Sequence, residues 1–234
     1  MSHKSKIVVL TGAGMSAESG LKTFRDHDGL WENHRVEDVA SIEGWYKNPS
    51  LVIDFYNQRR HELLNAQPNP GHKALADLEN EYDICIVTQN VDNLHERAGS
   101  SHVIHLHGEL LKVRSDKNEH IKITLTEENP EIHIGDKASD GGQLRPDIVW
   151  FGEAVPMIDT AIKEVESADI LLIIGTSLQV YPAAGLINYA RRDCDIYLID
   201  PYIPLAIQRQ KIHCIEQGAS EGMITFVNLL KNNN

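Results

Sequence analysis

The sequence has little cysteine, little positive charge and no long apolar run. Its three cysteines, Cys85, Cys194 and Cys214, are too few and too scattered for a disulfide framework, and Cys85 and Cys214 lie in strand-like runs typical of core residues. Lysine and arginine number 22 against 34 aspartates and glutamates, which gives a formal net charge of -12. Such a surface repels polyanions, so we expect no nucleic-acid partner and a preference for basic substrates such as lysine-bearing protein segments.

Nothing in the sequence resembles a secretory signal or a membrane anchor. The first residues, MSHKSK, lack the apolar centre of a signal peptide, and no apolar run approaches the roughly 20 residues that cross a bilayer. These absences predict a cytoplasmic protein with no membrane partner. The length of 234 residues suits one large α/β domain with an insertion.

Short apolar runs alternate with helical segments along the chain, which predicts an α/β fold with a doubly wound, Rossmann-like parallel sheet. The expected strands are Lys6–Leu10, Asp83–Thr88, Val103–Leu106, Asp169–Ile174, Asp195–Ile199 and Ile212–Cys214, and the expected covering helices are Pro70–Glu81, Asp159–Ser167 and Pro182–Arg191. Within this single domain, residues 1–234, we expect a helical insertion at 20–80 and a small second module of β structure at 112–145.

A glycine turn follows the first predicted strand. Residues 12–17, GAGMSA, fit the dinucleotide-binding pattern G-x-G-x-x-G/A, although such turns also occur without a nucleotide. Gly12 permits the tight turn, Gly14 lets the backbone approach a pyrophosphate, and the following helix N-terminus offers unpaired N–H groups. A hydride-transferring unit would reach a strand ending in Asp or Glu about 20 residues later. Here residues 23–26 lead into a loop and helix, which favours chemistry on the nucleotide itself.

Two polar stretches follow predicted strand ends, where ligands bind in such sheets. The first, residues 88–99, reads TQNVDNLHERAG, and its amides and carboxylate are equally consistent with helix caps. The second, residues 105–109, reads HLHGE, and its alternation sends both imidazoles to one side. A lone histidine is more often structural than catalytic, but His107, at a strand end beside a polar loop, is a better candidate base.

These motifs together resemble those of the sirtuin family of NAD-dependent protein lysine deacylases. The matching segments, in family order from about Lys6 to Asp200, are GAGMSAESG, TFRD, TQNVDNLHERAG, HLHGE, LRPDIVWFGEAVP and GTSLQVYPAAGL, and a shorter match lies at Gln217–Ser220. The resemblance implies NAD as cofactor and acyl-lysine proteins or peptides as partners. In the implied reaction the acyl carbonyl oxygen attacks the nicotinamide ribose, nicotinamide leaves, and the acyl group ends on ADP-ribose.

The resemblance also implies roles for individual residues. His107 would act as general base on a ribose hydroxyl. Asn90 and Asp92 would hold the ribose and the nicotinamide amide, Gln89 would assist at the ribose, and Phe24 would shield the reactive sugar face. The other implied cofactor contacts are Gly12, Ala13, Gly14, Arg25, Gly175, Thr176, Ser177, Asp200 and Ala219. At the position of Asp200 the family more often has Asn.

Two further segments resemble substrate-binding parts of the family. The segment Val149, Trp150, Phe151, Gly152 and Glu153 resembles the strand edge that pairs with the peptide backbone, although its aromatic residues also suit a core. Tyr56 and Arg59, at i and i+3 on a helix predicted from Pro49, resemble the acyl-pocket pair of the sirtuins that remove succinyl, malonyl and glutaryl groups. An arginine on a polar helix is usually solvated, but a guanidinium can grip a distal carboxylate bidentately. The pair therefore predicts desuccinylation and demalonylation, with deacetylation also possible.

The sequence departs from the family where zinc is usually bound. Sirtuins commonly carry two C-x-x-C pairs, but no cysteine lies between Arg114 and Arg145 here, and the matching places hold Ser115, Lys137 and Asp140. His120 and His133 lack thiolate partners and tetrahedral spacing, so we expect no bound metal. The apolar alternation over residues 121–125 predicts a module stabilised without one.

Two classes of function fit these motifs. The favoured one is an NAD-consuming lysine deacylase, and the other is a sirtuin-like module that hydrolyses NAD, transfers ADP-ribose, or senses NAD while recruiting a partner. His107 and the peptide edge at residues 149–153 favour the first.

Overall fold

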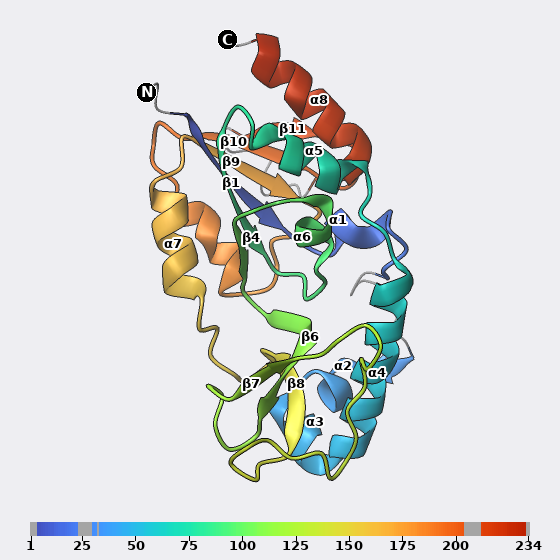
Figure 1. Cartoon of the computed structure of the whole chain (residues 1–234). Helices are drawn as coiled ribbons and strands as arrows, with labels where there is room; N and C mark the ends of the chain where they lie inside the picture. The colour runs from blue at the N-terminus through green and yellow to red at the C-terminus, as the bar shows by residue number, and fades with distance from the viewer. Residues whose placement is uncertain (1–3, 23–29, 32, 204–211, 233–234) are drawn as a thin grey trace.

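The structure is a computed structural model that describes residues 4–22, 30–31, 33–203 and 212–232. Two residues expected at the cofactor, Phe24 and Arg25, lie outside these ranges. Figure 1 shows two bodies, one built around a parallel sheet that carries both chain ends and the other around a smaller antiparallel sheet.

A six-stranded parallel sheet forms the first body, in the order β11-β10-β9-β1-β4-β5. Its strands are β1 (Lys6–Thr11), β4 (Asp83–Thr88), β5 (Val103–His105), β9 (Ile170–Ile174), β10 (Asp195–Ile199) and β11 (His213–Ile215). The chain winds outward from β1 through β4 and β5, then returns to β9 on the other side of β1. The doubly wound prediction is confirmed, and the reversal between β1 and β9 marks the position where such sheets bind ligands.

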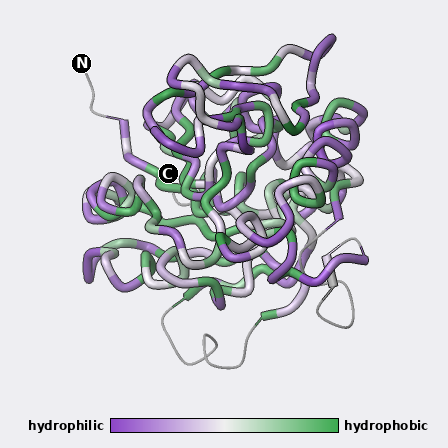
Figure 2. Tube along the Cα trace, turned by 90° about the horizontal axis from the view of Figure 1, so that it is seen from below, coloured by the Kyte–Doolittle hydropathy of each residue, from purple (hydrophilic) through white to green (hydrophobic). Residues whose placement is uncertain are grey.

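The central strand β1 is buried on both faces, and its residues Ile7–Leu10 are all apolar. Ile7 and Val9 pack on one face with α5 (Pro70–Leu78) and α8 (Ala219–Asn232). Val8 and Leu10 pack on the other with α7 (Ile158–Glu166) and the 3₁₀ helix η1 (Ala183–Tyr189). Successive strand residues point to opposite faces, so one continuous apolar run supplies two cores. In Figure 2 hydrophilic residues predominate on the outer turns.

The second body combines the helical insertion with the predicted β module. Its antiparallel sheet has the order β7-β6-β8. The elements are β6 (Gly108–Ser115), β7 (Lys122–Thr124), β8 (Leu144–Ile148), α2 (Val36–Val39), α3 (Ile42–Lys47), α4 (Pro49–Asn65) and the short pair β2 (Leu30–Trp31) and β3 (His34–Arg35). One hydrophobic core, which includes Val52, Phe55, Val113 and Trp150, joins α4 to this sheet. The two segments far apart in the sequence therefore form one folded unit.

Several expected details differ from the structure. The helix expected at Pro182–Arg191 is the shorter 3₁₀ helix η1, and the one expected to reach Glu81 ends at Leu78. Cys85 is buried as expected, but the expectation for Cys214 is wrong because β11 is the outermost strand and leaves this side chain exposed. Across the described residues, no helix combines the length and apolar character needed to cross a membrane.

Candidate functional site

A cleft of about 910 Å³ opens between the carboxyl ends of the parallel strands and the second body. Every described residue that the sequence implicated lines it. They are His107, Gly12, Ala13, Gly14, Gln89, Asn90, Asp92, Gly175, Thr176, Ser177, Asp200, Ala219, Tyr56, Arg59, Val149, Trp150, Phe151, Gly152 and Glu153. The cleft thus brings together the segments that resemble cofactor-binding and substrate-binding parts of one family.

Two glycine turns interlock at the floor of the cleft. The Gly14 N–H donates to Gly175 O at 2.9 Å, which ties the turn after β1 to the turn after β9. A Cβ on Gly12 would lie 2.7 Å from Thr176 Cβ, and one on Gly14 would lie 2.7 Å from Gly175 Cα. Gly175 itself has φ +61, and its Cβ would lie 2.3 Å from Met15 N. These glycines are therefore needed for the two turns to touch, in addition to any approach of a phosphate.

The expectation of several unpaired N–H groups at the following helix is wrong. Helix α1 (Gly14–Ala17) is one turn long, and its first N–H groups already donate to chain carbonyls. The Met15 N–H donates to Gly12 O at 2.9 Å and the Ser16 N–H to Ala13 O at 3.1 Å, because the turn is tight enough to close on itself. Among residues 12–16 only the Ala13 N–H has no hydrogen-bond partner within the described chain.

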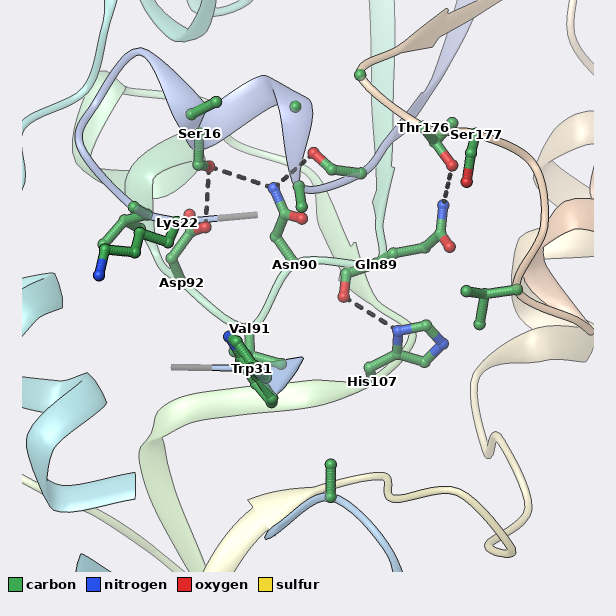
Figure 3. Close-up of a pocket in the computed structure, with 18 of the residues that line it drawn as sticks. Ser16, Lys22, Trp31, Gln89, Asn90, Val91, Asp92, His107, Thr176 and Ser177 are labelled. Carbon is green, nitrogen blue, oxygen red and sulfur yellow. Dashed lines mark hydrogen bonds between the residues drawn. The ribbon is translucent and has the colours of Figure 1, made fainter. Parts of the chain in front are cut away.

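A buried polar network connects this turn to the segment after β4 (Figure 3). Asn90 Nδ2 donates to Gly12 O at 3.0 Å and to Ser16 Oγ at 3.2 Å, and Ser16 Oγ donates to Asp92 Oδ2 at 2.9 Å. The Leu94 N–H donates to Asp92 Oδ1 at 3.1 Å, but Asp92 is not the N-cap of helix α6 (Leu94–Ala98), because that position is Asn93, whose side chain makes no capping hydrogen bond. Burial raises the pKa of Asp92, and these two hydrogen bonds oppose the rise. Asn90 thus has both amide hydrogens engaged, which fixes the direction of its carbonyl.

Ser16 is a site residue that the sequence reasoning missed. It lies within the GAGMSA turn, where only the glycine pattern was considered, and its hydroxyl is the link between Asn90 and Asp92. A hydroxyl two residues after the second glycine was the available signal.

His107 presents one ring nitrogen to the cleft. Its Nδ1 lies 3.0 Å from Gln89 O (Figure 3), and since a carbonyl can only accept, Nδ1 carries the proton in the neutral ring. Nε2 is then the basic nitrogen. Burial lowers the pKa of His107, and the hydrogen bond to Gln89 partly offsets this, so the ring is neutral at pH 7. Gln89 Nε2 donates in turn to Thr176 Oγ1 at 3.1 Å, which bridges the ends of β4 and β9.

His105 contacts the loop after β4 at Asn90, the residue that follows Gln89. Its Nδ1 lies 3.2 Å from Asn90 O and its Nε2 lies 2.8 Å from Glu96 Oε1. Burial disfavours the charge, but the hydrogen bond and charge of Glu96 outweigh it and raise the pKa of His105. His105 and His107 were predicted to point to the same side of their strand. Their Nδ1 atoms lie within hydrogen-bond distance of two consecutive carbonyls, those of Asn90 and Gln89.

A second polar layer lies beneath the loop and was not predicted. The Thr11 hydroxyl donates to Thr88 Oγ1 at 2.8 Å and contacts His95 Nε2 at 3.2 Å. The rings of His95 and His72 lie 4.8 Å apart. Burial lowers the pKa of His72 to about 4 and that of His95 well below its ordinary value, so both rings are neutral at pH 7.

The segment 149–153 is partly used by the protein itself. The Phe151 N–H donates to Ala40 O at 3.0 Å, and Phe151 O accepts from the Ile42 N–H at 3.3 Å. The Val149 N–H donates to His107 O at 2.9 Å, which ties this segment to the candidate base. Within the described residues no hydrogen bond reaches the backbone of Gly152, whose φ of +90 places it in a turn rather than in an extended strand.

Glu153 anchors the segment rather than facing the cleft with a free carboxylate. It accepts from Arg145 Nη1 at 2.9 Å, Arg145 Nη2 at 3.0 Å, Arg114 Nη2 at 3.0 Å and the Trp150 N–H at 2.9 Å. Burial opposes the charge of Glu153, but the bonds from Arg145 and Trp150 lower its pKa. The guanidinium carbon of Arg145 also lies 3.5 Å from the Trp150 ring centroid. Trp150 is therefore held from two sides.

Tyr56 and Arg59, the pair expected in the acyl pocket, line the cleft and are buried. Trp150 Nε1 donates to the Tyr56 hydroxyl at 2.9 Å, and burial raises the pKa of Tyr56, which keeps the phenol neutral. Arg59 is only 7% exposed, so the solvated alternative is wrong for this arginine. Its guanidinium carbon lies 5.2 Å from the Phe55 ring centroid, and its Nη2 forms an ion pair with Glu62.

Asp200 and Ala219 line the cleft directly after β10 and at the start of α8. Asp200 is buried, and its Oδ1 accepts from the Tyr202 N–H at 2.9 Å, so the carboxylate shapes its own turn. Glu18 Oε1 accepts from the Ser220 N–H at 3.1 Å, which joins the α8 start to the glycine turn.

The positions that match the family's zinc cysteines are bonded to one another. The Ser115 hydroxyl lies 2.9 and 2.8 Å from the two carboxylate oxygens of Asp140. Asp140 Oδ1 also accepts from the Gly142 N–H at 2.9 Å, and Ser115 Oγ accepts from the Lys117 N–H at 3.1 Å. The two loops that a metal would join are thus joined by a hydroxyl and a carboxylate.

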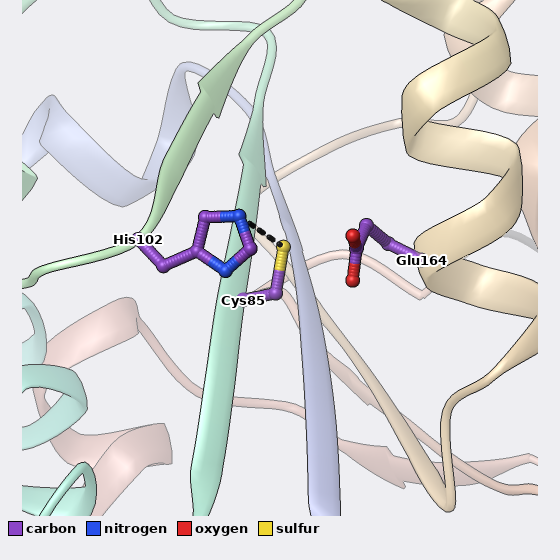
Figure 4. Close-up of side chains that lie close together, drawn as sticks. All are labelled: Cys85, His102 and Glu164. Carbon is purple, nitrogen blue, oxygen red and sulfur yellow. Dashed lines mark hydrogen bonds between the residues drawn. The ribbon is translucent and has the colours of Figure 1, made fainter.

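Cys85 of β4, Glu164 of α7 and His102 lie close together on the α7 side of the parallel sheet (Figure 4). Cys85 Sγ lies 3.8 Å from His102 Nε2, but the Lys6 ammonium lies 2.6 Å from the Glu164 carboxylate. Burial raises the pKa of the Cys85 thiol to about 12. A paired carboxylate and a disfavoured thiolate give no basis for a metal site.

We predict that the purified protein contains no stoichiometric zinc. The Ser115–Asp140 bonds supply the cross-link between the loops, so a chelator is not expected to lower the melting temperature. Elemental analysis of the purified chain and thermal melts with and without chelator measure both quantities. About one zinc per chain, or a melting temperature that falls on chelation, would overturn the prediction.

Comparison with known proteins agrees with the motifs. A family model described as the Sir2 family matches residues 12–182. Two curated relatives named NAD-dependent protein deacylase are similar over most of the chain. That of Bacteroides thetaiotaomicron is 57% identical over 227 residues, 96% of this chain and 97% of the relative, and that of Helicobacter pylori 26695 is 56% identical over 217 residues, 93% of each.

Solved structures of similar proteins share the fold. A complex of a Sir2 homologue with NAD superposes with a TM-score of 0.86 at 39% identity, covering 98% of this chain and 91% of that chain. A complex of Sir2 with a p53 peptide and NAD+ superposes with a TM-score of 0.80 at 28% identity, covering 97% and 94%.

Proposed function

Since the chain belongs to the Sir2 family and is an NAD-dependent protein deacylase, we propose that it removes succinyl and malonyl groups, and also acetyl groups, from protein lysines. The observation that carries this proposal is that Tyr56 and Arg59 line the same cleft as His107. A hydroxyl and a guanidinium are suited to the distal carboxylate of an acidic acyl chain. The products would be nicotinamide and O-acyl-ADP-ribose.

The cleft floor fits a dinucleotide. At Gly12, Gly14 and Gly175 side chains are absent where any Cβ would collide with backbone or Thr176, and the Ala13 N–H has no partner among the described residues. We propose that the pyrophosphate lies over this floor, with Ser177 and Thr176 beside it, and that Asp200 and Ala219 border the adenosine. NAD supplies the ribose whose bond to nicotinamide is broken.

The residues after β4 would orient the reacting end of the cofactor. The Asn90 amide hydrogens are held by Gly12 O and Ser16, so its carbonyl is available to a ribose hydroxyl or the nicotinamide amide. Asp92 accepts hydrogen bonds from the Ser16 hydroxyl and the Leu94 N–H, so its carboxylate has a fixed position beside the proposed site of the nicotinamide amide. A preset orientation of this kind favours the reacting geometry without a reorganisation cost at the moment of reaction.

His107 would act as the base. Its Nδ1 proton is committed to Gln89 O, and its lowered pKa keeps Nε2 unprotonated at pH 7, ready to accept the proton of a ribose hydroxyl. The protein would hold the peptide along the segment at residues 149–153, in which the Val149 N–H donates to His107 O. One short segment would thereby set the distance between the peptide and the base.

Incubation with NAD and matched peptides tests the reaction. We expect O-acyl-ADP-ribose to form in step with deacylation of succinyl-, malonyl- and acetyl-lysine peptides. Free ADP-ribose that accumulates without peptide turnover would instead indicate an NAD hydrolase. Turnover of the acetyl peptide alone would contradict the proposed acyl preference and leave the deacylase intact.

Replacing Arg59 with methionine should weaken turnover of succinyl peptides and spare that of acetyl peptides. The loss should equal one charged hydrogen bond, roughly 1.5–3 kcal/mol, or about tenfold to a hundredfold in kcat/KM. Because Arg59 is buried, the melting temperature of the variant serves as the control for folding. Equal losses on both peptides would mean that Arg59 serves the fold rather than the acyl pocket.

A further inference from the structure

The arginine proposed to bind acidic acyl groups already has an anionic partner inside the cleft. Arg59 and Glu62 are one helical turn apart on α4, their side chains form an ion pair, and both line the cleft. The Arg59 side chain is 8% exposed, whereas that of Glu62 is 39% exposed. Glu62 is therefore the partner with room to move toward solvent.

The adjacent arginine does not share this role. Arg60 Nε donates to Leu110 O at 2.8 Å and its Nη1 donates to Asn57 Oδ1 at 2.7 Å, within the core of the second body. Arg60 is fully buried and does not line the cleft. Of these two neighbouring cations, Arg59 is the one that an acyl chain can reach.

The charge balance of the pair affects acidic and neutral acyl groups differently. Arg59 and Glu62 together carry no net charge, so an acetyl group meets a locally neutral wall. A succinyl or malonyl carboxylate brings a second anion to one buried guanidinium, where like charges repel more strongly than in water. It must displace Glu62 or tolerate that repulsion, and a neutral acyl group needs neither.

We propose, on the basis of the function proposed above, that Glu62 is a specificity-determining residue that competes with acidic acyl chains for Arg59. In the absence of substrate Glu62 pairs with the guanidinium, and an acidic acyl carboxylate takes its place on binding. The competition lowers kcat/KM for acidic acyl-lysines and leaves that for neutral ones unchanged. The two values therefore lie closer together, and the cleft accepts both kinds of acyl group.

The Glu62→Gln variant tests the competition because it keeps the shape of the side chain and removes its charge. The kcat/KM ratio of succinyl to acetyl peptide should rise about tenfold relative to that of the unmodified protein. Glu131→Gln is the matched control. Glu131 lies outside the cleft and pairs with His61, which belongs to α4 as Glu62 does. That control removes one negative charge from the same body and should leave the ratio unchanged.

Each outcome distinguishes the competition from the proposed acyl preference. Suppose that the unmodified protein removes succinyl groups and needs Arg59 to do so, but the succinyl-to-acetyl ratio of kcat/KM stays constant or falls in Glu62→Gln. This result overturns the competition alone and means that Glu62 either orients Arg59 or has no role in specificity. Succinyl turnover gained only by Glu62→Gln supports the competition and overturns the preference. No succinyl turnover by either protein overturns both. If Glu62→Gln melts early, Glu62→Ala provides a second removal of the charge for the same ratio.

Discussion

Replacing His107 with alanine should lower deacylation by about 10²- to 10⁴-fold while the fold stays intact. The imidazole is the proposed base, and within the described residues the one hydrogen bond of its ring goes to Gln89 O. Loss of that bond affects one carbonyl at the cleft edge, so the melting temperature should change little. NAD binding, measured by calorimetry, should largely survive. Full turnover by a folded His107→Ala protein would remove the proposed mechanism.

The same residue sets the expected pH dependence. A base works when it is unprotonated, so kcat/KM should fall as the pH drops through the pKa of His107. Burial lowers that pKa, and the midpoint of the acid limb should therefore lie below the ordinary histidine value of about 6.5. A midpoint above that value would indicate that another group, such as His105 with its raised pKa, limits the reaction.

Replacing Gly175 with alanine should have the next largest effect, on both stability and cofactor affinity. Gly175 has φ +61, which costs an L-residue roughly 1–2 kcal/mol, and its new Cβ would lie 2.3 Å from Met15 N. Forcing backbone atoms apart adds about 1–3 kcal/mol, so we expect a destabilisation of about 2–5 kcal/mol and a melting temperature roughly 5–20 °C lower. Calorimetry would also record weaker NAD binding, because the turns after β1 and β9 would separate.

Gly20→Ala is the control for Gly175→Ala. Gly20 has φ +88, but a Cβ there would meet nothing within 4 Å, so this variant carries the backbone cost without the collision. The difference between the two variants measures how tightly the turns interlock. Equal melting temperatures would show that the contact between the turns contributes no stability.

The sheet was predictable because its strands carry their own signals. Apolar runs such as Ile7–Leu10 are buried on both faces, and any strand with that pattern must lie inside a parallel sheet. The meeting of the candidate site residues in one cleft was predictable for a different reason, since Asn90, His107 and Gly175 all follow strand ends that the sheet order brings to one edge. Strand position thus fixed which residues meet.

Contacts between distant segments were not predictable. Gly175 near Met15, Ser16 with Asp92, and Glu153 with Arg114 join residues far apart in sequence, and no local pattern encodes such pairs. The paired N–H groups of α1 escaped prediction because the generic turn pattern does not state how tightly the turn closes. Cys214 was misjudged because an apolar run does not say whether its strand lies at a sheet edge.

Besides holding Trp150, Glu153 pairs with Arg114 of β6 and with Arg145 of β8, so it ties both strands to the segment at residues 149–153.

 These interactions determine how the second body responds to its chemical surroundings. A cross-link made of carboxylates and guanidinium groups has no thiol to oxidise and no ion to extract, so peroxide or metal starvation would leave it in place. The cross-link is sensitive to acid, because the pKa of Glu153 is lowered in the folded protein. The stabilisation from Glu153 is therefore complete above the ordinary glutamate pKa and is lost as the pH falls through the lowered value.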